Sequence, residues 1–370
     1  MTERAPYRAD IVGSFLRPTA LAEARRRHAA GELSDADLRE VEDAEIATLV
    51  RHEAESGLAL ATDGEFRRSW WHFDFFGQLD GVEIVELDHG IQFQGVQTKP
   101  RGIRVTGPIA FPDDHPFLAH FVALRDALAG TGVEPKFTIP APTVLDFRLE
   151  PDNIHPDAYS GRDAIVDDLV TAYRDAVAAF YAAGARYLQF DDTAWAYLCS
   201  EDELAKARAR GIDTDGIAER YSGLLNRILA DRPDDLVITT HVCRGNFRST
   251  WISSGGYEPV AEALLAHTDY DGYFLEYDSE RAGGFEPLRF LPPGDKRVVL
   301  GLVTTKTGAL EDADDIRRRI DEAAAFAPLD QLALSPQCGF ASTEEGNTLT
   351  EAEQWAKIRS VVDIARTVWP

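Results

Sequence analysis

Four side chains with metal-binding chemistry stand directly after short apolar runs at widely separated places in the sequence. His241 and Cys243 end one such run, and Glu276 closes a second. Cys338 follows a third run, within a Ser-Pro-Gln-Cys-Gly segment. One imidazole, two thiolates and one carboxylate suit tetrahedral coordination of zinc. The pattern therefore favours a single metal site over four unrelated residues.

The remaining cysteine carries less information. The chain has three cysteines in 370 residues, and an odd number suits a reducing compartment better than a disulfide scaffold. Cys199 follows Ala-Tyr-Leu and is interpreted as a packed core thiol rather than a ligand.

The elements that must position these residues are short apolar runs alternating with longer helical patterns. Continuous apolar strands between amphipathic helices indicate a parallel sheet covered on its outer face. Eight such runs predict an α/β fold, a (β/α)8 TIM barrel. The expected strands are 11–14, 58–63, 137–140, 187–191, 237–241, 272–276, 298–303 and 332–336. The expected helices are 35–55, 157–183, 202–230, 259–267, 312–325 and 351–368.

One segment interrupts the alternation. Residues 70–106 are rich in aromatic residues and glycine and contain alternating apolar and polar residues. This pattern predicts a β-hairpin insertion after the second strand, where barrels of this type keep lids and specificity loops. No linker-like or low-complexity tract appears, so residues 1–370 are expected to form a single barrel domain.

Polar residues at the predicted strand ends extend the candidate site. In a TIM barrel the active site forms at the carboxyl ends of the strands. Besides the four metal-binding residues, polar side chains at these ends are Ser14, Asp63, Glu65, Asp191 and Asp192. We expect them to converge on one mouth of the barrel.

The overall charge excludes some functions. The formal net charge is −25 and the pI is about 4.7, which argues against nucleic acid or an anionic membrane surface as a partner. The N-terminus lacks the apolar stretch of a secretory signal, and no run is long enough to cross a membrane. We expect a soluble cytoplasmic protein.

Several of these segments together resemble the cobalamin-independent methionine synthase family, in particular its catalytic C-terminal barrel and its single-barrel relatives. The matching pieces are Val-Gly-Ser-Phe at 12–15, Asp-Gly-Glu-Phe at 63–66, Gln-Phe-Asp-Asp at 189–192, Thr-His-Val-Cys at 240–243, Glu276 and Cys-Gly at 338–339. Their order and spacing carry the resemblance over nearly the whole chain.

The resemblance implies a zinc-dependent methyltransferase that moves a methyl or alkyl group to a thiol, most simply homocysteine to give methionine. Zinc would be bound by His241, Cys243, Glu276 and Cys338. Ser14, Glu65 and Asp191 fall where the family holds the amino-acid part of homocysteine, with the two carboxylates facing its ammonium group. A bound zinc would deprotonate the substrate thiol.

The sequence leaves the identity of the methyl donor open. Methyltetrahydrofolate and a methylated corrinoid protein are the two expectations, because residues 138–147 lack the tryptophan that stacks on the pterin in the family. The aromatic residues Trp70, Trp71, Phe73, Phe75 and Phe76 either wall a donor pocket or pack the hairpin against the barrel. A leaving donor atom needs a proton, for which the candidate acids are Asp192, His115 and His155.

Two other enzyme classes remain as alternatives. One is an alkyl-thiol transferase or carbon–sulfur lyase that acts on another thiol or thioether. The other is a uroporphyrinogen decarboxylase-like enzyme, which shares the fold but has no use for metal thiolates. A binding protein with a structural zinc is disfavoured, because closed structural sites usually lack a carboxylate ligand.

Overall fold

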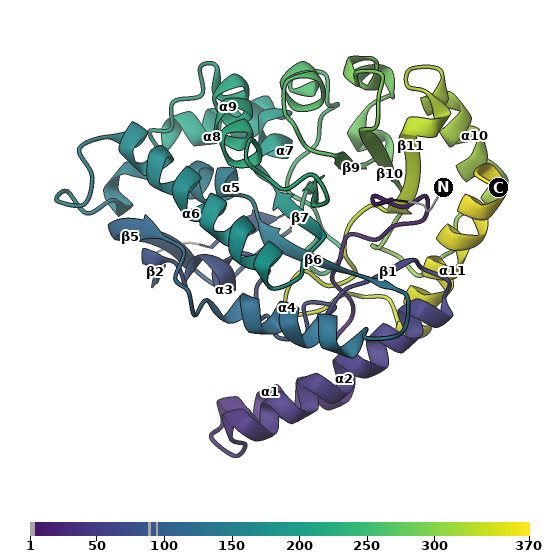
Figure 1. The fold of residues 1–370 in the computed structure, drawn as a ribbon. Helices are drawn as coiled ribbons and strands as arrows, with labels where there is room; N and C mark the ends of the chain where they lie inside the picture. Colours follow the sequence, from purple (N-terminus) through teal and green to yellow (C-terminus); the bar gives the residue numbers. More distant parts are fainter. Residues whose placement is uncertain (1–3, 88–89, 94) are drawn as a thin grey trace.

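Seven parallel strands form one curled sheet whose strand order follows the sequence, β1-β6-β7-β8-β9-β10-β11. The computed structural model describes residues 4–87, 90–93 and 95–370. The strands are β1 (Leu60–Ala61), β6 (Glu134–Pro140), β7 (Tyr187–Asp192), β8 (Val237–Val242), β9 (Gly272–Glu276), β10 (Arg297–Val303) and β11 (Leu332–Pro336). The chain is thus an α/β protein with a TIM-barrel-like sheet (Figure 1).

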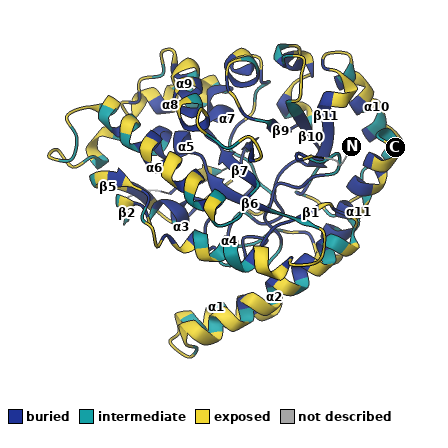
Figure 2. Ribbon diagram, viewed as in Figure 1, coloured by how far each residue is buried: buried dark blue, intermediate teal, exposed yellow. Residues whose placement is uncertain are grey.

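Helices cover the outer side of the sheet (Figure 1). The α-helices of the described residues, of which α1 protrudes from the molecule, are α1 (Thr19–Ala29), α2 (Asp35–Glu55), α3 (Phe73–Phe76), α4 (Pro116–Ala127), α5 (Pro142–Arg148), α6 (Arg162–Ala182), α7 (Ala194–Leu198), α8 (Glu201–Ala209), α9 (Ile217–Leu229), α10 (Ala313–Ala324) and α11 (Glu351–Val368). The strands are dark blue, hence buried, in Figure 2, whereas the outward faces of the long helices are exposed. This two-sided burial explains why the strands are continuous apolar runs.

The first expected strand, 11–14, is not a strand, and the sheet has seven strands among the described residues rather than eight. Residues 9–14 make only isolated bridges, from Ala9 to Leu334 and from Ser14 to Gly64. Side chains inside the barrel donate hydrogen bonds to the carbonyl groups of this segment instead. Gln189 Nε2 donates to Val12 O at 2.8 Å, and Thr62 Oγ1 donates to Gly13 O at 2.7 Å. Segment 9–14 therefore lies between the outer strands β1 and β11 without a regular ladder.

The expected helix 202–230 is also wrong, because it is two helices, α8 and α9. Gly211 and Gly216 have φ values of 82° and 60°, a left-handed conformation that ends α8 and precedes α9. The expected segment 259–267 forms a short π-helix, Glu262–Ala266. Helices α2 and α11 keep the predicted bounds, and each begins with a capping box, from Ser34 and Thr350.

Between β1 and β6 the chain forms two small antiparallel pairs. Strand β2 (Asp80–Glu86) pairs with β5 (Arg101–Ala110), and β3 (Gln92–Phe93) pairs with β4 (Val96–Gln97). Residues 70–79, which the sequence assigned to a hairpin, instead hold bends and α3. The β2–β5 pair lies at one side of the molecule beside α3 (Figure 1).

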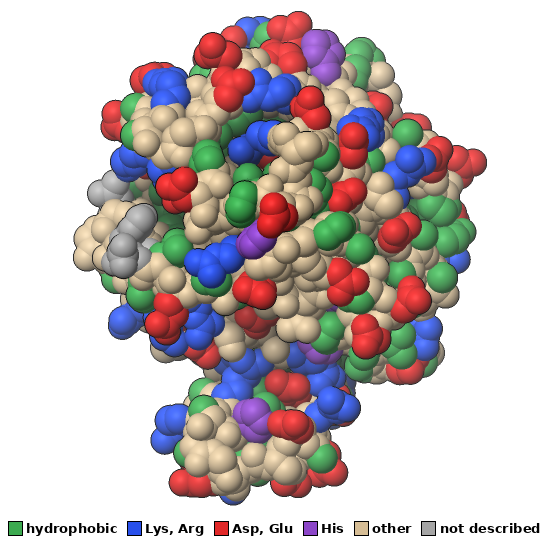
Figure 3. Space-filling view, turned by 90° about the vertical axis from the view of Figure 1, so that its left-hand side faces the viewer, with side chains coloured by type: hydrophobic (Ala, Val, Ile, Leu, Met, Phe, Trp, Pro, Cys, Tyr) green, Lys and Arg blue, Asp and Glu red, His purple; other side chains and the backbone are tan. Residues whose placement is uncertain are grey.

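The surface is charged and mixed. On the face seen in Figure 3, acidic and basic side chains are interspersed, and the hairpin of α1 and α2 protrudes at the bottom. None of the helices among the described residues is long and apolar enough to cross a bilayer.

Candidate metal centre and its cavity

The four predicted metal-binding residues lie together. His241 is in β8 with Cys243 just beyond it, Glu276 ends β9, and Cys338 stands two residues after β11. Because neighbouring parallel strands end at the same edge, their last residues meet there. One ligand atom from each residue lies within 4.8 Å of all the others.

The spacing of these atoms fits tetrahedral zinc. Typical zinc–ligand bond lengths place neighbouring ligand atoms about 3.3–3.8 Å apart. The sulfur atoms of Cys243 and Cys338 are 3.6 Å apart, and His241 Nε2 is 4.0 Å from Glu276 Oε1. Glu276 Oε2 is buried without a hydrogen-bond partner among the residues that the structure describes. The donor set therefore suits a zinc ion that fills the space between the four side chains.

Neighbouring groups orient the ligands. Asp191 Oδ1 lies 3.6 Å from His241 Nδ1, while His241 Nε2 lies 4.0 Å from Glu276 Oε1 and 3.2 Å from the backbone oxygen of Gln337. The backbone N–H of Arg244 donates to Glu276 Oε1 at 2.8 Å, and that of Gly245 donates to the Cys243 sulfur at 3.3 Å. Contacts of this kind fix the ligand geometry before a metal arrives.

The site has a strongly negative potential. Burial alone would lower the pKa of His241, yet the hydrogen bond with Asp191 and the nearby Cys338 and Glu276 raise it to about 9. The hydrogen bond between the two thiols lowers the pKa of Cys338 and raises that of Cys243. Such a potential attracts a cation.

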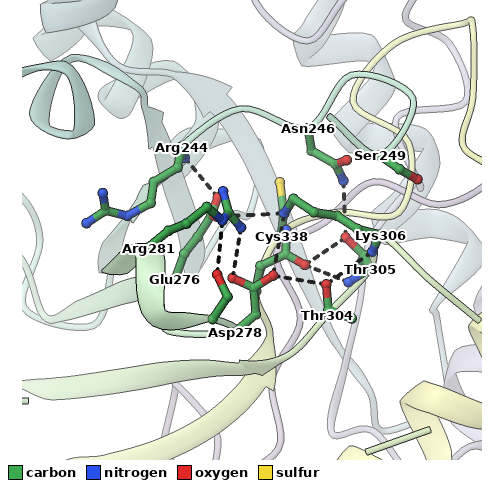
Figure 4. A network of polar contacts seen from close by, with 12 residues as sticks. Arg244, Asn246, Ser249, Glu276, Asp278, Arg281, Thr304, Thr305, Lys306 and Cys338 are labelled. Atoms are coloured by element: carbon green, nitrogen blue, oxygen red, sulfur yellow. Dashed lines mark hydrogen bonds and ion pairs between the residues drawn. The ribbon is translucent and has the colours of Figure 1, made fainter. Parts of the chain in front are cut away.

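Lys306 is the cation nearest to Glu276 in the network of Figure 4. Its Nζ lies 4.0 Å from Glu276 Oε2 and 3.6 Å from Asp278 Oδ2, and the lysine side chain is only 10% exposed. Asp278 also accepts a hydrogen bond from Thr304, at 2.9 Å. Lys306 thus offsets part of the negative charge on the side of Glu276 that faces β10.

The predicted substrate-binding residues line the same cavity as three of the ligands. Ser14, Glu65 and Asp191 share its wall with His241, Cys243 and Cys338. These six residues, which were expected at one mouth of the barrel, therefore line one cavity, and their roles in binding stay a prediction.

Glu65 is held in an unusual state. Its φ of 59° is left-handed, which is rare for a residue with a side chain. Its Oε1 accepts from Thr138 at 3.1 Å and lies 3.5 Å from Arg68, while Oε2 is buried and unpaired among the described residues. Burial raises the pKa of Glu65 to about 7, despite the opposing charge of Arg68. The unpaired oxygen is available for a ligand.

The three candidate acids do not line this cavity. His115 packs against Phe75 and Phe111, and burial lowers its pKa to about 4. His155 is exposed in a loop, where its Nδ1 accepts from Asp157 N. Asp192 is buried, and its carboxylate accepts from Thr143 Oγ1 and from Ala194 N rather than facing the cavity. The alternation of side chains along β7 explains why Asp192 does not line the cavity, because Asp191 and Asp192 point to opposite faces.

The aromatic segment is divided between a cavity wall and the core. Trp70 and Trp71 line the metal-site cavity, whereas Phe75 and Phe76 are fully buried in the core. The sequence analysis overlooked His72, which also lines the cavity. Its position directly after the two tryptophans was the available signal.

Comparisons with known proteins agree with this geometry. The family model described as "Cobalamin-independent synthase, Catalytic domain" matches residues 8–367. Uncharacterized protein YxjG of Bacillus subtilis is 51% identical over 369 residues, which span 99% of this chain and 96% of that protein. The chain therefore belongs to the family of cobalamin-independent synthases, through their catalytic domain.

Solved structures give the same result. A putative vitamin-B12 independent methionine synthase from Listeria monocytogenes is 40% identical, with a TM-score of 0.80 and full coverage of both chains. A B12-independent methionine synthase from a Shewanella species, in complex with selenomethionine, has the same fold at 19% identity, with a TM-score of 0.70 and coverage of 97% of this chain and 96% of the other.

Proposed function

We propose that this chain is a zinc-dependent methyltransferase that moves a methyl group to a thiol, most simply homocysteine to give methionine. The observation that carries the proposal is the cluster of His241, Cys243, Glu276 and Cys338, three of which line one cavity with Ser14, Glu65 and Asp191. Family membership supports methyl transfer as the reaction. We further propose that residues 1–370 act as one barrel domain, with β2–β5 as an insertion beside the cavity.

Each residue has a distinct role in this proposal. When bound, zinc would keep the substrate thiol deprotonated at neutral pH. Glu65 and Asp191 face the ammonium group of the thiol substrate, and Ser14 lies at its carboxylate. The two cysteines and Glu276 keep the site negative, so that the substrate sulfur stays electron-rich. During transfer the carbon–sulfur bond forms as the donor–carbon bond breaks, and the donor atom keeps the electron pair.

Family membership favours this transferase over the uroporphyrinogen decarboxylase-like alternative. A transferase or lyase for another thiol or thioether uses the same ligand set, so substrate tests must separate it from methionine synthesis. The donor is either methyltetrahydrofolate or a methylated corrinoid protein, and neither nucleic acid nor a membrane takes part.

The first experiment is zinc analysis of the purified protein by mass spectrometry, with Cys338→Ser beside the wild type. We expect about one zinc per chain in the wild type and almost none in the variant. Cys199→Ser is the matched control, because Cys199 is a buried thiol that donates to Trp195 O outside the cluster. Homocysteine should shift the zinc absorption edge towards more sulfur ligands.

If the purified protein contains no zinc, or if no thiol changes the zinc absorption edge, the proposal is wrong. Zinc that responds to other thiols but not to homocysteine would instead favour the alternative acceptor.

A further inference from the structure

His72 is a fully buried imidazole without a hydrogen-bond partner among the described residues. Its exposed fraction is 0%, and neither ring nitrogen has a hydrogen-bond partner within residues 4–87, 90–93 and 95–370. Leaving a buried donor or acceptor unpaired costs about 1–3 kcal/mol. A side chain that carries such a cost beside a cavity is a candidate for ligand contact.

The rings around His72 hold it in place. Its ring centroid lies 4.5 Å from that of Trp71 and 4.0 Å from that of Phe73. His72 also precedes α3, where its carbonyl accepts from Phe76 N at 2.9 Å. The imidazole is therefore fixed against the cavity wall by packing rather than by polar contacts of its own.

A second cavity adjoins the first at Arg148 and is lined by Phe73, the residue after His72. The metal-site cavity is small, about 40 Å³, whereas its neighbour is about 440 Å³. The two share Ile91, Arg148 and Ile252 as lining residues. The larger volume lies in the range of small-molecule sites, which is about 300–1,000 Å³.

The lining of the larger cavity has a recognisable chemistry. Phe147 and Tyr197 form a stacked pair with ring centroids 5.2 Å apart, and Arg148 donates to the Tyr197 hydroxyl at 3.2 Å. Arg101, Arg210 and Lys206 add positive charge, partly offset by Glu150 and Glu203. An aromatic wall with several cations suits a flat molecule that carries an anionic group.

We propose that His72 is a binding residue for the methyl donor, a small molecule that occupies the larger cavity and reaches past Arg148 towards the metal centre. This inference rests on the proposed function. Ser14, Glu65 and Asp191 line the smaller cavity for the amino-acid part of the thiol, so His72 and Arg148 are left for the second substrate. A neutral imidazole offers this substrate one N–H donor and one nitrogen acceptor.

The protonation state of His72 agrees with its proposed role in binding the methyl donor. Burial, and then the positive charge of Arg148, lower the pKa of His72 well below its usual value. The ring is therefore neutral, and it contacts a polar uncharged group of the donor while Arg148 takes the anionic group.

The test uses the zinc-loaded full chain with 5-methyltetrahydrofolate and, separately, methylcobalamin as probes. His72→Phe keeps an aromatic ring and removes both nitrogens, while His72→Gln keeps hydrogen bonding. His120→Phe is the control, because His120 is also a poorly hydrated imidazole but lies on a different cavity. With histidine labelled at Cε1 by ¹³C, the His72 signal is the one that His72→Phe removes.

We expect one probe to shift the His72 signal, and homocysteine alone to leave it in place. His72→Phe should raise KM for that probe about tenfold, with unchanged zinc content and unchanged KM for homocysteine. His72→Gln should recover part of the loss, and His120→Phe should match the wild type.

If neither probe shifts the His72 signal, or if homocysteine alone shifts it, the inference is wrong, although the proposed transferase function is unaffected. Activity with a methylated corrinoid protein that is equal in His72→Phe and wild type would overturn it as well. Failure of the proposed function would look different, because the wild type itself would then lack zinc or methyl transfer.

Discussion

Asp191 has two contacts that belong to different tasks. Its Oδ1 accepts from Gln189 Nε2 at 2.7 Å and lies 3.6 Å from His241 Nδ1, while its side chain also reaches the cavity. The residue therefore contacts His241, a predicted metal ligand, and lines the cavity that is predicted to hold the thiol substrate.

Asp191→Asn should accordingly weaken both functions. We expect metal affinity to fall about 10- to 100-fold, as is typical when the partner of a ligating histidine is lost, together with a higher KM for homocysteine. Competition with a chromophoric chelator measures the first effect. Asp192→Asn is the control, because that buried carboxylate contacts Thr143 and Ala194 instead. Equal metal affinity in Asp191→Asn and wild type would contradict the orienting role.

Glu65 predicts a pH dependence of amino-acid binding. Burial disfavours its charged form and raises its pKa to about 7, so the carboxylate is mostly protonated below that pH and ionised above it. Binding of methionine, which has no titrating thiol, should therefore strengthen about tenfold from about pH 6 to about pH 8. Calorimetric titration measures this slope, and Glu65→Gln should flatten it. A slope that persists in Glu65→Gln would assign it to another group.

The raised pKa of Glu65 also affects the stability of the fold, which decreases with rising pH, whereas amino-acid binding strengthens. Between the unfolded pKa of about 4.5 and the folded value of about 7, the folded protein holds the proton more tightly. The contribution of Glu65 to stability is therefore greatest below about pH 4.5 and declines as the pH rises through this window.

At the scale of elements, segment 9–14 depends on a buried ion pair. Lys136 in β6 lies 2.9 Å from Asp10 Oδ1, and both side chains are fully buried. Asp10 Oδ2 also accepts from Tyr187 of β7 at 2.9 Å, while Val12 packs with Phe274, Val299 and Ala333 inside the barrel. Polar and apolar contacts together replace the missing ladder.

Lys136→Met should destabilise the fold by about 3–5 kcal/mol, because it leaves the Asp10 carboxylate buried without its cation. Urea denaturation followed by far-UV circular dichroism measures the change. The double variant Asp10→Asn, Lys136→Met should lose less, since no buried charge then remains unpaired. Equal losses in the single and double variants would show that packing, not charge, governs this site.

At the scale of the whole molecule, the metal ligands lie on strands that are already held by other contacts. Strands β8 and β9 pair with each other, and β11 pairs with β10. These ladders and the large core do not involve the ligand side chains. The four residues of the candidate metal site therefore lie on strands whose pairing and core packing do not depend on their side chains.

Removal of zinc by a chelator should thus leave the far-UV circular dichroism spectrum unchanged at room temperature. The Tm should fall, because a ligand present at a thousandfold excess over its Kd stabilises the native state by about 4 kcal/mol. Cys338→Ser should show the lower Tm without any response to chelator. Unfolding on chelation would instead indicate a structural zinc.

Much of this protein follows from local sequence. Helices α2 and α11 keep their predicted bounds because Ser34 and Thr350 cap them. Strands β9 and β11 also match, since continuous apolar runs with clear ends leave few alternatives. The four residues predicted to bind zinc lie together in the structure because the carboxyl ends of parallel strands meet at one edge.

Tertiary structure alone decided the rest. Segment 9–14 reads as a strand, yet Gln189, Thr62 and other interior side chains bind its carbonyl groups. Asp192 stands beside Asp191 in the sequence, but the pleat turns it away from the cavity. His72 looks like one more ring in an aromatic run, and only the tertiary structure shows its nitrogens beside a cavity with no hydrogen-bond partner in the described part of the chain. Sequence determines residue types and their order along an element, whereas long-range packing determines which polar atoms are left free to bind a substrate.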